Sequence, residues 1–158
     1  MLAGSGWSYL PENRRTTPAQ GTTTLGDSDL WLADFAWQSL VAGYRVTGQR
    51  PQRLDGQLLV VLELTPAVCG AEPAMRVWVL ADNALPIRIE TLDAAGEVSW
   101  TIHVREYRRF GETYIATRLL FVDSRRQGYA TEVTIDDSST APLASQLFTI
   151  PFLQLVGG

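Results

Sequence analysis

Residues 98–105 read Val-Ser-Trp-Thr-Ile-His-Val-Arg, so apolar and polar side chains alternate along the whole stretch. A period of two is typical of a β-strand with one buried face, because successive side chains of a strand point to opposite sides. Residues 129–136 alternate in the same way. We therefore expect both stretches to be strands of a sheet, and the chain to be mainly β.

Outward from residues 98–105, short turn signals separate further strand-like runs. Asp55-Gly56 and Asp93-Ala94-Ala95-Gly96 are typical of tight turns. Short turns can join only antiparallel neighbours, since parallel neighbours need a long crossover. The sequence thus predicts an antiparallel meander. Its strands are expected near residues 43–49, 56–65, 75–81, 86–92, 97–109, 112–123 and 127–136.

Residues 27–40 predict a helix, with a side chain at its start that can cap the first turn. The helix is apolar on more than one side, because Trp37 falls on one face while Trp31 and Phe35 fall on another. A helix with this pattern is normally packed between two surfaces. Together with the strands, it predicts an α+β fold in which one helix covers an antiparallel sheet.

The two ends of the chain are less regular. Residues 7–10 predict a short strand, and residues 11–28 are rich in proline, glycine and threonine, which indicates turns. Residues 147–153 are a short apolar closing segment. We expect residues 1–158 to form a single domain, because a chain of this length fits one hydrophobic core.

Composition excludes several classes of function. The net charge is −4, the 13 basic residues are all arginine, and the absence of lysine removes Schiff-base and P-loop lysine chemistry. The acidic balance argues against nucleic acid as a partner. Residues 1–6 lack the features of a signal peptide, and no stretch approaches the roughly 20 apolar residues of a membrane helix.

Catalytic chemistry has few candidate residues. His103 is the single histidine and lies in the middle of an expected strand. No serine lies in the glycine-rich turn of a catalytic nucleophile, so His103 has no nucleophile to activate as a base. Cys69 lies in an expected loop with no activating base nearby. The carboxylates of Asp29 and Asp34 are explained by a helix start and an exposed helix side. We therefore expect no enzyme activity, no catalytic residue, no metal and no cofactor.

Aromatic residues are abundant, with five tryptophans and five phenylalanines. Such residues usually pack a core. Antiparallel barrels can also enclose an apolar cavity, in which a few polar groups orient a ligand. Composition leaves both interpretations open.

Several segments, in order, resemble the outer-membrane lipoprotein-sorting family of LolA-like periplasmic carriers. Residues 7–15 resemble its W-x-Y-L-P-x-x-R-R stretch, and residues 27–35 resemble its G-S-D-F-x-x-x-D-L helix start. Residues 56–66 resemble its strand ending in L-E-L-T-P. Residues 77–96 follow its V-W-V-D…L-P-x-R-x-E-x-x-D-x-x-G run, with Leu80 in place of the aspartate. No counterpart of the family's first strands precedes Trp7, so the chain resembles an N-terminally shortened member.

The resemblance implies a strongly curved antiparallel sheet, an unclosed barrel half, with a helix over its concave apolar face. It also implies a periplasmic carrier or chaperone that binds acyl chains of lipids or lipoproteins for outer-membrane lipoprotein sorting. A membrane-bound donor or acceptor protein would then be a partner. The alternative is a lipid- or protein-sensing module of the same fold, dimeric through an exposed sheet edge. The expected cavity wall contains Trp31, Phe35, Trp37, Trp78 and Trp100.

Overall fold

The structure is a computed structural model, which describes residues 6–10, 15–19, 30, 43–68, 72–126, 128–137, 141–142 and 144–156. The chain divides into two compact units. One consists of Ser39–Ser138, and the other combines Met1–Gln38 with Ser139–Gly158. Each unit is described separately below.

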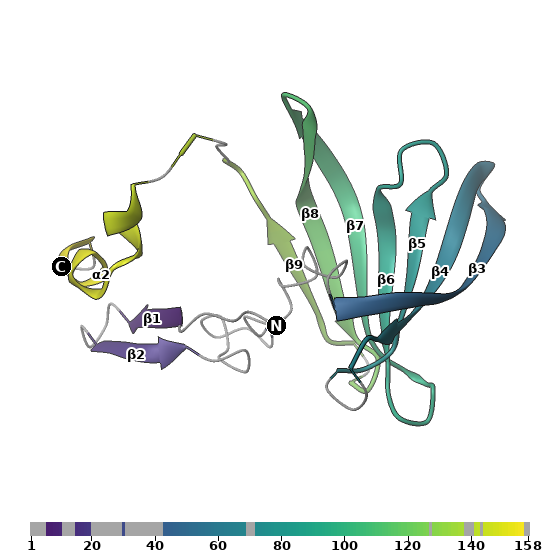
Figure 1. Cartoon of the computed structure of the whole chain (residues 1–158), viewed down its shortest axis with the longest axis horizontal. Helices are drawn as coiled ribbons and strands as arrows, with labels where there is room; N and C mark the ends of the chain where they lie inside the picture. Colours follow the sequence, from purple (N-terminus) through teal and green to yellow (C-terminus); the bar gives the residue numbers. More distant parts are fainter. Residues whose placement is uncertain are drawn as a thin grey trace. The chain divides into compact units, whose positions relative to one another are not determined.

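The larger unit is a seven-stranded antiparallel sheet in which each strand pairs with the next along the chain (Figure 1). The terminal strands β3 and β9 do not pair with each other, so the barrel is unclosed. The strands are β3 (Tyr44–Leu54), β4 (Gln57–Pro66), β5 (Met75–Leu80), β6 (Pro86–Leu92), β7 (Val98–Phe110), β8 (Thr113–Asp123) and β9 (Ala130–Thr134).

All seven strands predicted for this region are therefore confirmed, and β3 runs further than expected, to Leu54. The turn between β3 and β4 explains that end. Asp55 and Gly56 have φ angles of 50° and 82°. Two consecutive positive φ angles are the geometry of a tight hairpin turn whose twist matches that of its strands. The two-residue turn lets pairing continue to its very edge, where Leu54 faces Gln57.

Extra residues in the strands help to bend the sheet. The register skips one residue at Thr47 in β3, at Ile87 in β6, and at Ser99 and Arg105 in β7. A further residue, Thr117, is extra in β8. Each β-bulge bends its strand and increases the local twist. The result is the strongly curved sheet that Figure 1 shows.

One row of cross-strand neighbours forms the centre of the core. Leu62, Val77, Ile89, Ile102 and Phe121 lie opposite one another on β4 to β8. The last four of these side chains are buried, and Phe121 is 0% exposed. Cross-strand partners point to the same side of a sheet, so this row defines one face, which we call the apolar face.

The smaller unit contains a hairpin and a C-terminal helix. The predicted strand at residues 7–10 is confirmed as β1 (Gly6–Leu10), which pairs with β2 (Arg15–Ala19). The sequence predicts turns over residues 11–28 from their proline, glycine and threonine content, and this is wrong for β2, which pairs with β1. The closing segment contains the 3₁₀-helix η3 (Ser145–Phe148) and the helix α2 (Ile150–Val156). Pro151 is tolerated in the first turn of α2, because backbone N–H groups there have no hydrogen-bond partner within the helix and proline lacks this group.

The predicted covering helix at residues 27–40 lies outside the described residues except for Leu30, which is buried with 2% of its surface exposed. Among the described residues, no helix combines the length and the hydrophobicity that a membrane crossing requires.

We expect Phe121→Ala to lower the free energy of unfolding by about 3–5 kcal/mol, because it removes a fully buried ring from the centre of the apolar row. Urea unfolding measures this change. The matched control is Tyr114→Ala on the same strand, whose side chain is 45% exposed and whose loss should cost less than about 1 kcal/mol. Equal effects of the two substitutions would contradict the central place of Phe121 in the apolar row.

Candidate ligand-binding face

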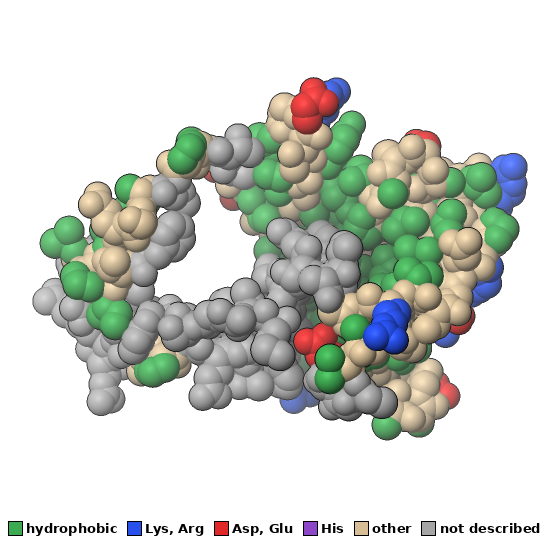
Figure 2. Space-filling model, in the orientation of Figure 1, with side chains coloured by type: hydrophobic (Ala, Val, Ile, Leu, Met, Phe, Trp, Pro, Cys, Tyr) green, Lys and Arg blue, Asp and Glu red, His purple; other side chains and the backbone are tan. Residues whose placement is uncertain are grey.

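The apolar face extends beyond its central row on both sides. Toward one end of the sheet it carries Val104 and Leu119, which are cross-strand partners and both buried. Toward the other end it carries Leu64, Met75 and Trp100, in the order of the strands. In Figure 2 the hollow of the seven-stranded sheet is lined by hydrophobic side chains, while charged side chains lie at its rim. That composition matches the apolar face.

Trp100 is the large aromatic residue of this face on β7. It lies opposite Thr91 on β6 and Asp123 on β8, and its ring centroid is 6.4 Å from that of Phe121 at an angle of 48°. The indole Nε1 is buried and has no hydrogen-bond partner in the described part of the chain. The sequence-based placement of Trp100 on a cavity wall is thus compatible with its register.

Trp78 lies on the opposite face, which we call the charged face. Its cross-strand partners are Val61 on β4 and Arg88 on β6. It is three residues from Met75 on the same strand, and an odd spacing without a bulge in that strand reverses the side. Trp78 and Trp100 therefore cannot line one cavity wall together.

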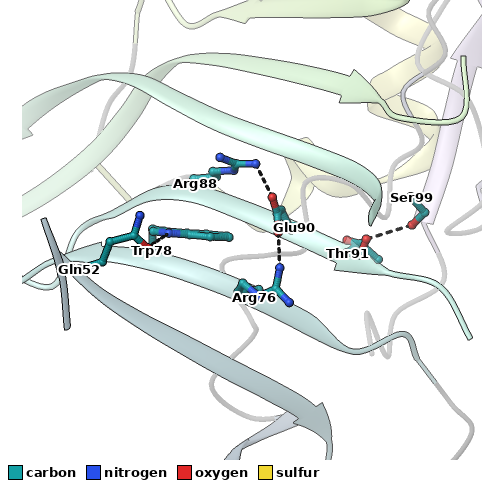
Figure 3. Close-up of polar contacts among 7 residues, drawn as sticks. All are labelled: Gln52, Arg76, Trp78, Arg88, Glu90, Thr91 and Ser99. Atoms are coloured by element: carbon teal, nitrogen blue, oxygen red, sulfur yellow. Dashed lines mark hydrogen bonds and ion pairs between the residues drawn. The ribbon is translucent and has the colours of Figure 1, made fainter. Parts of the chain in front are cut away.

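The protein itself completes the surroundings of Trp78 (Figure 3). Its indole Nε1 donates a hydrogen bond to Oε1 of Gln52 at 3.1 Å. The guanidinium groups of Arg88 and Arg76 lie 4.8 Å and 5.9 Å from its ring centroid, within the range of cation–π attraction. The ring also packs with Leu59 and Val61, both 0% exposed, in a small cluster of its own.

Glu90 links the same two arginines. Its carboxylate is 3% exposed and accepts a 3.0 Å hydrogen bond from Nη1 of Arg76 and another from Nη2 of Arg88. A buried carboxylate is tolerated only when such charged partners compensate its lost hydration. The carboxylate of Glu90 is therefore compensated on the charged face (Figure 3), while Nε of Arg76 and Nε of Arg88 are buried without a partner among the described residues.

Three of the five expected wall residues, Trp31, Phe35 and Trp37, lie outside the described residues. Cys69 does as well. Among the side chains that the structure describes, no group of three histidine, cysteine, aspartate or glutamate residues is arranged to hold a metal ion.

A shallow groove of about 380 Å³ lies at one end of β4 and β5, lined by Gln57, Leu58, Leu80, Ala81 and Asp82. Leu58 is 47% exposed and continues the apolar side of β4, because it is four residues from Leu62. Exposed apolar surface thus continues along β4 to the end of the apolar face.

The register is what separates the two tryptophans. Trp100 lies on the same side as Ile102 and Val104, whereas Trp78 lies between Val77 and Val79, where the strand is apolar on both sides. The residues that sequence reasoning missed are aliphatic: Leu62 and Ile102 occupy the centre of the apolar face. They were missed because the expected wall residues were chosen among the aromatic side chains.

Comparisons with known proteins agree on the fold. A family model described as "Uncharacterized protein" matches residues 3–154. A domain from Vibrio parahaemolyticus, named as an outer membrane lipoprotein-sorting protein domain, is 20% identical with a TM-score of 0.74. The alignment covers 94% of this chain and 65% of that one. No match was found among curated proteins.

Two further solved structures have the same architecture. A DUF1329 family protein from Desulfovibrio piger is 18% identical with a TM-score of 0.76, covering 93% of this chain and 63% of that one. A LolA superfamily protein from Nitrosomonas europaea is 19% identical with a TM-score of 0.70, covering 90% and 65%. The fold is therefore LolA-like, as the sequence resemblance implied, and the chain spans 63% to 65% of the length of these three proteins.

The charged face makes stability depend on pH through His103. Burial lowers the pKa of His103 below 6.5, and the nearby charges of Arg88 and Arg105 lower it further, against an opposing effect of Glu90. The unfolded chain then binds a proton more readily than the folded one. The stability that His103 contributes is therefore complete above pH 6.5 and is lost as the pH falls through its folded pKa.

We expect His103→Gln to be less sensitive to acid than the wild type. The difference in unfolding free energy between the two proteins should shift in favour of the variant as the pH falls from 7.5 to 5. Urea unfolding at each pH measures it, and His103 is the single histidine of the chain, so no other imidazole contributes. A difference that stays constant over this range would contradict the assigned direction of the pKa shift.

Proposed function

The chain belongs to the family described as "Uncharacterized protein", and we propose that it is a carrier for acyl chains. Its fold, which is that of lipoprotein-sorting and LolA-superfamily proteins, supports this proposal. The proposed cargo is a lipid or the acyl chains of a lipoprotein, and the proposed compartment is the periplasm. The activity would be shielding and transport for outer-membrane lipoprotein sorting, without chemical conversion of the cargo.

The observation that supports this proposal is the apolar face of the sheet. Five successive strands contribute an aliphatic or aromatic residue to one row, and hydrophobic side chains line the hollow of the sheet. An acyl chain gains about 0.8 kcal/mol for each methylene removed from water, so a long apolar surface is the main requirement for binding. A carrier of this kind needs no catalytic group.

The proposed cargo wall is the apolar face with Trp100. Trp31, Phe35 and Trp37 of residues 27–40 are proposed to complete it as a cover. A cover that moves would allow loading and release, and these steps would take place at a membrane-bound donor or acceptor protein. Trp78 is not included, because its side chain belongs to the charged face.

Two leucines give a matched test of this proposal. Leu62 and Leu120 are both half-buried, but Leu62 lies on the apolar face and Leu120 lies on the charged face, opposite His103. We expect Leu62→Asn to weaken the binding of a fluorescent fatty acid about tenfold or more, because a polar amide would contact the chain. Leu120→Asn should leave the affinity unchanged, and titration of the fluorescence measures both.

Urea unfolding of both variants separates lost binding from lost folding. Equal weakening by the two substitutions would contradict binding on the apolar face. The absence of saturable binding by the folded wild type would contradict the carrier function itself.

A second candidate function is a lipid- or protein-sensing module that dimerises through a sheet edge. The observation in its favour is that β3, an edge strand of 11 residues, pairs only with β4 among the described residues. This strand also contains Pro51 and three arginines, Arg45, Arg50 and Arg53. Charged residues and proline are the usual protection of an edge against pairing. We therefore rank the dimeric module below the carrier.

Sedimentation velocity at micromolar concentration tests this ranking. We expect a monomer in the wild type, because the arginines of two antiparallel β3 edges would repel each other. A wild-type dimer would instead favour the sensing module and would contradict the protection assigned to β3.

A further inference from the structure

The indole of Trp100 carries a hydrogen-bond donor that the described residues do not satisfy. Its Nε1 is buried and has no partner among them. A buried donor without an acceptor loses its hydration without compensation, so it is unfavourable and uncommon. A phenylalanine ring would fill similar space on the apolar face without this cost.

Neighbouring polar groups are engaged elsewhere. Asp123, the cross-strand partner of Trp100, accepts three hydrogen bonds from Arg125: from its backbone amide, from Nε at 3.0 Å and from Nη2 at 3.4 Å. Thr91, the partner on the other side, accepts at its carbonyl oxygen from the hydroxyl of Ser99 at 3.1 Å. The carboxylate of Asp123 and the carbonyl oxygen of Thr91 therefore accept hydrogen bonds from other donors.

The other tryptophan of the sheet provides an internal comparison. Trp78 lies on the charged face, and its Nε1 has an acceptor within the protein, Oε1 of Gln52. The two indoles thus differ in one respect, because the protein supplies an acceptor to Trp78 and leaves the donor of Trp100 open. Nε of Arg76 and Nε of Arg88 on the charged face also lack a partner among the residues that the structure describes, but each guanidinium donates to Glu90 through another nitrogen. The indole of Trp100 has one donor, and it belongs to the face that we propose for the cargo.

We propose that Trp100 recognises the carbonyl oxygen of an acyl group, so that the site prefers acyl esters to alkyl ethers of the same length. This inference rests on the proposed carrier function and adds the chemical class of the cargo's polar group. Burial of the hydrocarbon chain on the apolar face stabilises the complex with either cargo. The indole N–H distinguishes the two cargos, because the carbonyl oxygen is the stronger acceptor and lies one atom from the chain.

The test compares 1-palmitoyl-glycerol, an ester, with 1-O-hexadecyl-glycerol, its ether analogue, as competitors of a bound fluorescent fatty acid. We expect the wild type to bind the ester about threefold to tenfold more tightly, which corresponds to one neutral hydrogen bond. Trp100→Phe should abolish this preference while it still binds the ether. Trp78→Phe, the same change on the charged face, should keep the preference.

Two results would overturn the inference while leaving the carrier function intact: a wild type that binds both lipids equally, or a Trp100→Phe variant that keeps the wild-type preference. The first needs no variant, so it decides the matter even if Trp100→Phe does not fold. A folded wild type that binds neither lipid would overturn the carrier function, and the inference with it. Circular dichroism and urea unfolding establish the folding of each variant.

Discussion

The antiparallel register of the seven-stranded sheet is the constraint on which the rest of the structure depends. Because cross-strand partners share a side, the register aligns Leu62, Val77, Ile89, Ile102 and Phe121 into one row. A shift of one residue in any strand would turn that strand's apolar side chains to the other face. The separation into an apolar and a charged face is therefore a property of the pairing as a whole.

The two faces solve the problem of buried polar groups in different ways. On the charged face, Glu90 and Trp78 find their partners within the protein, in Arg76, Arg88 and Gln52 (Figure 3). Such compensation is what allows a carboxylate to be 3% exposed. On the apolar face, the Nε1 of Trp100 has no comparable partner in the described part of the chain. On the charged face, Glu90 and the indole of Trp78 have partners, although Nε of Arg76 and Nε of Arg88 are also buried without one in the described part of the chain. The indole of Trp100 differs from these guanidinium groups because Nε1 is its one donor.

This division suits the proposed carrier function. Binding of an acyl chain requires apolar area and shielding from water, and both come from a curved sheet with one hydrophobic side. The bulges matter here because bends at positions such as Thr47 and Ile87 curve the sheet. Hydrophobic side chains line the hollow of the curved sheet (Figure 2). Shared architecture with lipoprotein-sorting proteins establishes the fold, and the cargo has to be argued from the face itself.

The sequence by itself determined the seven strands of the larger unit and their antiparallel order, because period-two alternation and turn residues such as Asp55-Gly56 are local signals. The LolA-like fold was implied by the resemblance of several segments to that family. The expected alternation of Trp100, Ile102 and Val104 agrees with the side that they share in the register. The sequence missed β2, a strand that the pairing with β1 stabilises. Only the tertiary structure decided which tryptophans share a face, because the sides of two strands can be related only through their register and bulges. Trp78 and Trp100 are the same residue type on opposite faces, and the hydrogen-bond partner that one has and the other lacks comes from a different strand.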